Sequence, residues 1–309
     1  MRTLKEIVSL VLIIGGLINI CYILSSYINF FEVYNQCGND SIIPLQPNFL
    51  SILPFNYVII FIGLYRISSP YVKYLFKKFS KEELKALFHH FINSSSSLYS
   101  CGGKYCIRFY NKDLVLHNIF SELAYVIYNK RPTTISIKNS YLTQLYSKRA
   151  MNEKFKDIME ESKDVKKEFI RLLMSSEGWI TCFFLNNKIY PKIGLGSTTS
   201  YEKLKIYNEV TSDFGMKFNI HLDSRYGNKG FLTSSSYNTL NNFIKIGGFI
   251  EGVIIKKGIF KGIEKNSLAN TIIKLKDKKF ENQEEVIDTI KLATMDDTLK
   301  IYLYRLMLG

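Results

Sequence analysis

The chain has 309 residues and is 47% hydrophobic and 14% aromatic, so it can bury a large core, and global disorder is excluded. Its length allows two or three domains of ordinary size. The formal net charge is +14, of which +3 lies in residues 1–80 and +11 in residues 81–309. This balance favours nucleic acid or an anionic membrane surface as a partner, although a solvated lysine-rich surface would give the same total.

The cysteines do not indicate a zinc site. None of them forms a CxxC pair, no second pair completes a set of zinc ligands, and the four histidines do not supply one. Unpaired thiols in a reducing compartment are the simplest interpretation of Cys21, Cys37, Cys101, Cys106 and Cys182.

Two uncharged stretches near the N-terminus have the composition of membrane-spanning helices. The first, "IVSLVLIIGGLINICYILSS", is twenty residues long, which is enough to cross a bilayer core. The second runs over 41–65 and is densest at "YVIIFIGLY". They predict helices over about 7–26 and 50–66, joined by an external loop at 27–49. For the second stretch, a buried core helix or a re-entrant segment is the alternative.

The distribution of basic residues sets the expected orientation of this anchor. The loop 27–49 has no Lys or Arg, whereas basic residues flank both spans on the other side, at Arg2, Lys5, Arg66, Lys73, Lys77 and Lys78. By the positive-inside rule both termini and the C-terminal domain are cytoplasmic, as a two-pass protein of the cell membrane. The run "YVKYLFKKFSK" would contact anionic membrane lipid. A cleaved signal peptide fits poorly, since the first alanine of the chain is Ala86.

A duplicated pattern follows the anchor. In "KEELKALFHHFINSSSSLYS" (81–100), apolar residues recur at helical spacing, and "KKEFIRLLMSSEGWITCFF" (166–184) has the same order of charged start, apolar helix, small residues and strand. Each copy continues with a strand, a capped helix and a hairpin; in the first copy the hairpin is "TTISIKN" and "YLTQLYS", with its turn expected at Asn139–Ser140. From Ser95 to Ser147 is 52 residues, and from Glu177 to Ser235 is 58. Such close spacings favour an internal duplication.

Four stretches of the duplicated region carry a resemblance to a known family. "EFIRLLMSSEGWI", "IRFYNKDLVLHNIF", "YLTQLYSK" and "IGGFIEGVIIKKGIFKGIEKN" resemble, in this order of motifs, the LAGLIDADG (dodecapeptide) homing endonucleases over about 83–275. The resemblance implies an α+β fold of two α-β-β-α-β-β-α repeats that form a pseudo-twofold saddle. It also implies double-stranded DNA in the saddle, and Mg²⁺ held by one acid from each of the two motif helices. The expected segments are an anchor over 1–80, repeats over 81–160 and 161–275, and a helical tail over 276–309.

The chain departs from this family at its catalytic centre. The alignment places Glu177 at the acid position of the second repeat, as the catalytic residue and metal ligand, but Ser95 at the equivalent position of the first. Asn93 and Ser175 stand where further acids can occur. A serine hydroxyl is a weak ligand for a hard cation, so half of the expected metal site is missing and cleavage is expected to be weak or lost.

Strand alternation predicts the side chains that face DNA. Ile107, Phe109, Ile135, Ile137, Ile193 and Leu195 are expected to point inward, which leaves Cys106, Tyr110, Thr134, Ser136 and Asn219 among the outward residues. A solvated charged face is the alternative for each cation. The residues expected to contact DNA are Lys104, Arg108, Lys138, Gln144, Lys192, His221, Arg225 and Lys229.

Three functions remain open at this stage. The first is a membrane-anchored DNA-binding protein of homing-endonuclease descent. The second is an active, Mg²⁺-dependent, site-specific endonuclease that uses Glu177 with a substitute ligand. The third is an interaction module that retains only the fold.

Overall fold

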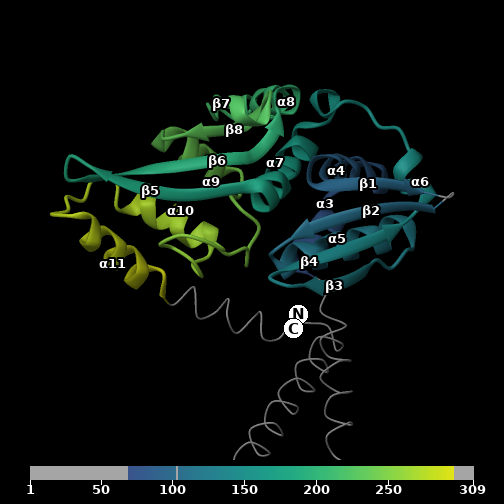
Figure 1. Ribbon diagram of the computed structural model, residues 1–309, viewed down its shortest axis with the longest axis horizontal. Coiled ribbons are helices and arrows are strands. Elements are labelled where there is room, and N and C mark those ends of the chain that lie inside the picture. The colour runs from purple at the N-terminus through teal and green to yellow at the C-terminus, as the bar shows by residue number, and fades with distance from the viewer. Residues whose placement is uncertain (1–68, 102–103, 296–309) are drawn as a thin grey trace, which may run out of the picture. The chain divides into compact units, whose positions relative to one another are not determined.

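The computed structural model describes residues 69–101 and 104–295 (Figure 1). The predicted membrane helices over 7–26 and 50–66 lie outside this range and stay predictions. Among the described residues, none of the helices has both the length and the apolar character to cross a bilayer. The described residues from Ser69 to Met295 form one compact unit, which includes α3 (Pro70–Lys78) together with both repeats.

The described elements confirm the predicted α-β-β-α-β-β-α order in both repeats. The first repeat comprises α4 (Lys81–Ser95), β1 (Ser96–Cys101), β2 (Lys104–Asn111), α5 (Leu114–Tyr128), β3 (Thr133–Ile137), β4 (Ser140–Tyr146) and α6 (Lys148–Asn152). The second comprises α7 (Lys163–Glu177), β5 (Gly178–Leu185), β6 (Lys188–Ser200), α8 (Tyr201–Ser212), β7 (Asn219–Asp223), β8 (Lys229–Ser234) and α9 (Tyr237–Lys245). Short 3₁₀ turns, η1 (Ile158–Glu160) and η2 (Ser224–Tyr226), interrupt the connections, and α10 (Lys265–Lys274) and α11 (Gln283–Ala293) follow.

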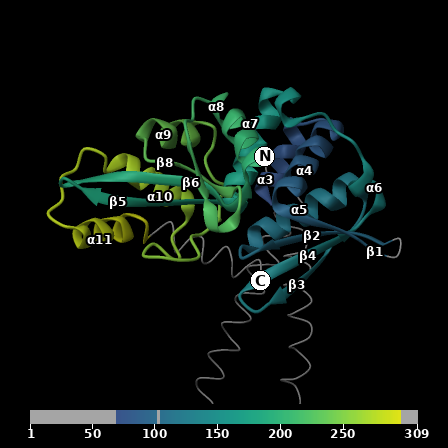
Figure 2. The same ribbon diagram turned by 45° about the horizontal axis from the view of Figure 1, so that its top comes forward.

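Each repeat folds its strands into one antiparallel sheet with the same topology. The strand orders are β1-β2-β4-β3 and β5-β6-β8-β7, so in each repeat the fourth strand pairs with the second. The two sheets lie on either side of the central helices α4 and α7 (Figures 1 and 2). Ile107, Phe109, Ile193 and Leu195 are fully buried, as the alternation predicted.

The serine run 94–97 is regular structure. Ser94 and Ser95 form the last positions of α4, and Ser96 is the C-cap of this helix and the first residue of β1. The helix begins at a capping box formed by Ser80 and Glu83. The chain passes directly from helix to strand because Ser96 is extended, with φ −124°.

The predicted facing of β3 was wrong. The turn lies at Lys138–Asn139, one residue earlier than predicted, with Lys138 at φ 52°, and Ile137 therefore pairs with Ser140. This register places Ile135 and Ile137 on the open face, 44% and 37% exposed, while the Thr134 hydroxyl lies 2.7 Å from that of the fully buried Thr143. The row of Ile135 and Leu142 continues to Tyr110 on the open face, whereas Thr134 lies in the row of Thr143 and Phe109, which are buried. The inner face of this edge strand therefore carries its polar residues, and the isoleucines occupy the outer face.

Cys106 was expected to point outward, and although it does, it is only 2% exposed. Its side chain does lie on the open face of β2, as the alternation predicted. The register pairs it with Tyr99 on one side and Tyr146 on the other, and these larger side chains flank the small thiol. An outward position on a strand therefore does not imply exposure where neighbouring strands carry large rings.

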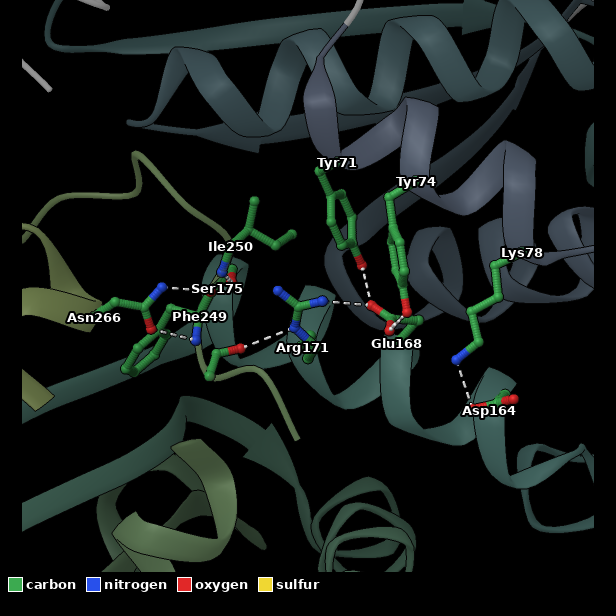
Figure 3. A network of polar contacts seen from close by, with 11 residues as sticks. Tyr71, Tyr74, Lys78, Asp164, Glu168, Arg171, Ser175, Phe249, Ile250 and Asn266 are labelled. Carbon is green, nitrogen blue, oxygen red and sulfur yellow. Dashed lines mark hydrogen bonds and ion pairs between the residues drawn. The ribbon is translucent and has the colours of Figure 1, made fainter. Parts of the chain in front are cut away.

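A buried carboxylate joins α3 to the second repeat (Figure 3). Glu168 of α7 is fully buried and accepts hydrogen bonds from the hydroxyls of Tyr71 (2.9 Å) and Tyr74 (3.1 Å). The Arg171 guanidinium also donates to it at 2.9 Å, and donates in addition to the carbonyl of Gly248 at 3.3 Å. Three donors satisfy a charge that would otherwise be costly to bury.

Loss of this charge should destabilise the compact unit strongly. Glu168→Gln leaves the Arg171 guanidinium without its counter-ion, so we expect a loss of about 3 kcal/mol in the free energy of unfolding. The matched control is Asp164→Asn on the same helix, which breaks the more exposed Lys78–Asp164 pair and should cost below about 1 kcal/mol. Urea unfolding of residues 69–309 measures both values. Equal losses would contradict the role assigned to Glu168.

Candidate functional site

The two motif helices end side by side. Helices α4 and α7 each have 15 residues and pack against one another, and Ser95 and Glu177 are their last residues. Across the junction the hydroxyl of Ser95 lies 2.9 Å from that of Ser176, the residue before Glu177. The structure therefore brings the two predicted site positions to the same end of the helix pair.

Gly178 makes the abrupt turn from α7 into β5 possible. Its backbone is extended, with φ −85°, so no unusual conformation is required. The constraint is steric, because a Cβ at this position would lie 2.4 Å from the carbonyl oxygen of Met174. Only glycine lets β5 start directly behind Glu177, so the glycine of this pair is explained by sterics alone.

Two lysines act on the Glu177 carboxylate. Its side chain reaches solvent, yet the protein packed around it removes enough hydration to raise the pKa of Glu177 above its ordinary value. The charges of Lys265 and Lys203 oppose this effect. Lys203 also donates to the carbonyl of Asn93 at 2.9 Å, so it connects α8 to the end of α4.

Lys265 is a buried cation at the C-terminal end of α7. Its ammonium donates to the carbonyls of Ser175 (3.0 Å) and Gly178 (2.6 Å), which are left over where the helix ends. Burial lowers the pKa of Lys265 to about 8. Sequence reasoning cannot single out this residue among the four lysines of the stretch "KKGIFKGIEKN", because only the fold buries one of them.

The other family acid positions have structural roles. The Ser175 hydroxyl accepts from the backbone N–H of Ile250 at 2.8 Å, and the Asn93 amide lies 2.8 Å from the Nε2 atom of His89. Asp113 is also buried, where it caps α5 and accepts from the N–H of Ile254. The segment that follows the second repeat is therefore anchored to both repeats.

The histidine pair of α4 does not form a metal site within the described chain. His90 lies 3.4 Å from the Glu161 carboxylate and packs its ring against Phe169. His89 packs against Phe155, and burial lowers its pKa to about 4. The His89 ring thus packs on the connection between the repeats, whereas the His90 ring lies between that connection and α7.

The groups around Glu177 do not fit a divalent cation. A Mg²⁺ ion is held by several oxygens with carboxylate among them, whereas here one carboxylate is accompanied by the Ser95 and Ser176 hydroxyls and by two ammonium groups. The Ser176 hydroxyl also donates to the carbonyl of Leu173. Among the described residues, no three acidic, histidine or cysteine side chains gather where they could bind a metal.

The residues predicted to contact DNA fall into separate groups. Arg108 and Gln144 lie side by side on the open face of the first sheet, and Lys192 and His221 lie exposed on that of the second. Lys138 is in the β3–β4 turn, so its predicted place on a strand face was wrong. The remaining three are Lys104 at the start of β2, Lys229 at the start of β8, and Arg225, which is paired with Asp223 at 2.6 Å.

A scan against protein-family models finds no match, and neither does a search of curated proteins. Among solved structures, the chain is similar to full-length DUF199/WhiA from Thermatoga maritima, with 15% identity over 75% of this chain and 70% of that chain and a TM-score of 0.45. The N-terminal LAGLIDADG domain of DUF199/WhiA is 19% identical over 56% of this chain and 84% of that chain, with a TM-score of 0.41.

A third similar structure is that of I-DmoI in complex with DNA and Mn. It is 16% identical over 54% of this chain and 97% of that chain, with a TM-score of 0.41. The structural neighbours are thus LAGLIDADG proteins, the family that the sequence motifs resemble. Because these TM-scores are low, the architecture rests on the strand orders and the helix pairing of the chain itself.

Removal of Lys265 should change how stability depends on pH. The pKa of Lys265 is about 8 in the folded protein and about 10.5 as an ordinary lysine, so between these values the unfolded chain binds more protons. Stability contributed by Lys265 should therefore rise by about 3 kcal/mol from pH 8 to 10.5, and be lost as pH falls through that window. Lys265→Met should lack this rise, whereas Lys274→Met, exposed on the same helix, should keep it. Urea unfolding across this window measures the difference, and equal slopes would contradict the assignment.

Proposed function

We propose that this protein is a membrane-anchored DNA-binding protein of homing-endonuclease descent that cleaves weakly or not at all. One observation carries the DNA-binding part: the eight strands of the two sheets contain a single carboxylate, Asp223, and that one is paired with Arg225. The cations on or beside the strands are therefore not offset by acids in the strands, which suits a polyanion on the open faces.

Loss of cleavage is proposed from the residues at the helix ends. One acid from each motif helix would be needed to hold a cation between two scissile phosphates, and Ser95 supplies none. The charges of Lys265 and Lys203 occupy the surroundings of Glu177 instead. An ammonium group attracts a phosphate but does not activate water as a metal ion does, so this centre is suited to binding.

The DNA prediction is a salt-dependent affinity for duplex DNA. Several phosphate contacts should make the affinity of residues 69–309 fall on the order of a thousandfold between about 50 and 200 mM salt. Replacing Arg108, Lys192 and Lys229 together by alanine should flatten this slope, whereas the same change at the exposed residues Lys274, Lys276 and Lys291, outside the sheets, should leave it unchanged. Fluorescence anisotropy measures both. Absence of binding at low salt would favour an interaction module.

Restoration of the missing acid tests the cleavage proposal. The natural protein should show at most slow nicking with Mg²⁺ or Mn²⁺. Ser95→Asp places a second carboxylate beside Ser176, the residue that precedes Glu177, so Mn²⁺ should bind more tightly, as measured by calorimetry. Ser97→Asp adds the same charge at an exposed position of β1 and should leave Mn²⁺ affinity unchanged. Ready double-strand cleavage by the natural protein would show that another ligand replaces Ser95, in favour of the active endonuclease.

The membrane anchor and its orientation are likewise a proposal, supported by the uncharged stretches and by the absence of Lys and Arg from 27–49. A reporter fused after Lys78 should be active on the cytoplasmic side, and one inserted in the loop 27–49 on the outer side. The opposite pattern would show that the orientation is reversed. A full chain that is soluble without detergent would contradict the membrane anchor.

A further inference from the structure

Three tyrosines stand on the open face of the first sheet without ring partners. Tyr99, Tyr110 and Tyr146 are 47%, 50% and 55% exposed, and within the described chain none of them packs against another ring. The register places Tyr99 and Tyr146 in one row across β1, β2 and β4, and Tyr110 four positions along β2 from that row. These three side chains form what we call the tyrosine platform.

Arg108 lies within this platform. The register sets it beside Gln144, in the row between Cys106 and Tyr110, and its guanidinium lies 4.7 Å above the ring of Tyr99. Its Nε atom is buried and makes no hydrogen bond to any described residue. The guanidinium is thus held as a cation against one ring of the platform, where its other nitrogens are placed to meet an anionic group or a base beside the tyrosines.

The charge of the face restricts the kind of partner. Strands β1 to β4 contain no Asp or Glu, so the charged residues within them are the cations Lys104 and Arg108. The platform thus combines exposed aromatic rings with positive charge. A neutral apolar partner would leave the Arg108 charge uncompensated on binding, whereas an anion with flat rings would satisfy both features.

Within the part of the chain that the structure describes, the second sheet does not present aromatic rings that are free to stack on a partner. Phe183 stacks on Tyr190 at 5.5 Å and His221 on Phe231 at 5.3 Å, so the rings on that face are largely engaged with one another. Trp179 lies across Gly194, where a Cβ would be 2.2 Å from its ring. The two sheets share a topology but only the first presents unengaged rings among the described residues.

We propose that the tyrosine platform binds single-stranded DNA, with bases stacked on Tyr99, Tyr110 and Tyr146 and with Arg108 donating to a phosphate or a base. This rests on the DNA-binding function proposed above and specifies the form of DNA that the first sheet recognises. In a duplex the base faces are stacked inside and only base edges and phosphates are accessible, so exposed rings contribute little there. Unpaired bases offer the flat faces that these rings can stack on.

The test uses the full-length chain in mild detergent and labelled oligothymidylate, with the corresponding duplex and oligouridylate in parallel. Tyr99→Ala, Tyr110→Ala and Tyr146→Ala combined should weaken oligothymidylate binding on the order of a hundredfold and duplex binding by less than about threefold, since each stacked base contributes separately. The triple change to Phe keeps the rings and should retain the affinity. The control is Tyr125→Ala with Tyr201→Ala, two tyrosines of similar exposure on helices.

Each alternative outcome has a defined meaning. Duplex binding without oligothymidylate binding would overturn this inference and leave the proposed DNA-binding function standing. If neither DNA is bound, both the inference and the proposed function are overturned. Preference for oligouridylate would assign the platform to RNA and overturn the choice of DNA. Dimers of the natural protein that dissociate in the alanine variant, as measured by analytical ultracentrifugation, would make the face an interface between copies. If the alanine variant does not fold, loss of binding in Arg108→Gln with retained near-ultraviolet circular dichroism supports the proposal, and unchanged binding overturns it.

Discussion

The geometry of the whole unit depends on two charges buried along one helix. Glu168 fixes the first half of α7 to α3 through the hydroxyls of Tyr71 and Tyr74, while Lys265 caps its far end. Buried ions contribute little net stability, because desolvation offsets their attraction, but each tolerates only one arrangement of its partners. The two charges therefore specify where α3 and α10 dock more than they strengthen the fold. Helix α7 is therefore the element to which both α3 and α10 are attached.

The same helix connects this arrangement to the candidate site. Arg171 donates both to Glu168 and to the carbonyl of Gly248. The backbone N–H of Ile250, two residues further on, donates to the hydroxyl of Ser175, so this segment is bound to α7 at two points (Figure 3). Glu177 is the last residue of this braced helix. Its position is consequently fixed by contacts with structural roles, and the glycine that follows it is explained by its close approach to the carbonyl of Met174. The chemistry proposed for the centre depends instead on the charge balance, in which ammonium groups outnumber carboxylates.

Much of the fold could be predicted from sequence, because two periodic patterns repeated in the same order. The amphipathic spacing of Leu84, Leu87 and Phe91 and the alternation around Ile107 and Phe109 reflect burial directly, and both were right. The alternation failed at Ile135 and Ile137, because β3 is an edge strand whose five residues are all exposed, so apolar type does not mark its inner face, which carries Thr134 opposite the buried Thr143. Lys265 could not be predicted, since its burial depends on contacts between segments far apart in the chain. Local pattern thus determined the elements, whereas long-range contacts determined the site.

Duplication explains the shared topology of the repeats but not their surfaces. In the second sheet the aromatic rings stack on each other, which buries part of their apolar area without a partner. In the first sheet Ile135, Ile137 and three tyrosines stay exposed although the same β1-β2-β4-β3 arrangement was available for ring pairing. Exposed apolar area of this kind lowers solubility and brings no stability to the isolated fold. The exposed rings lie beside Arg108, which stacks on Tyr99, so the face joins apolar area to a positive charge, and this combination is the physical basis of the binding site proposed for it.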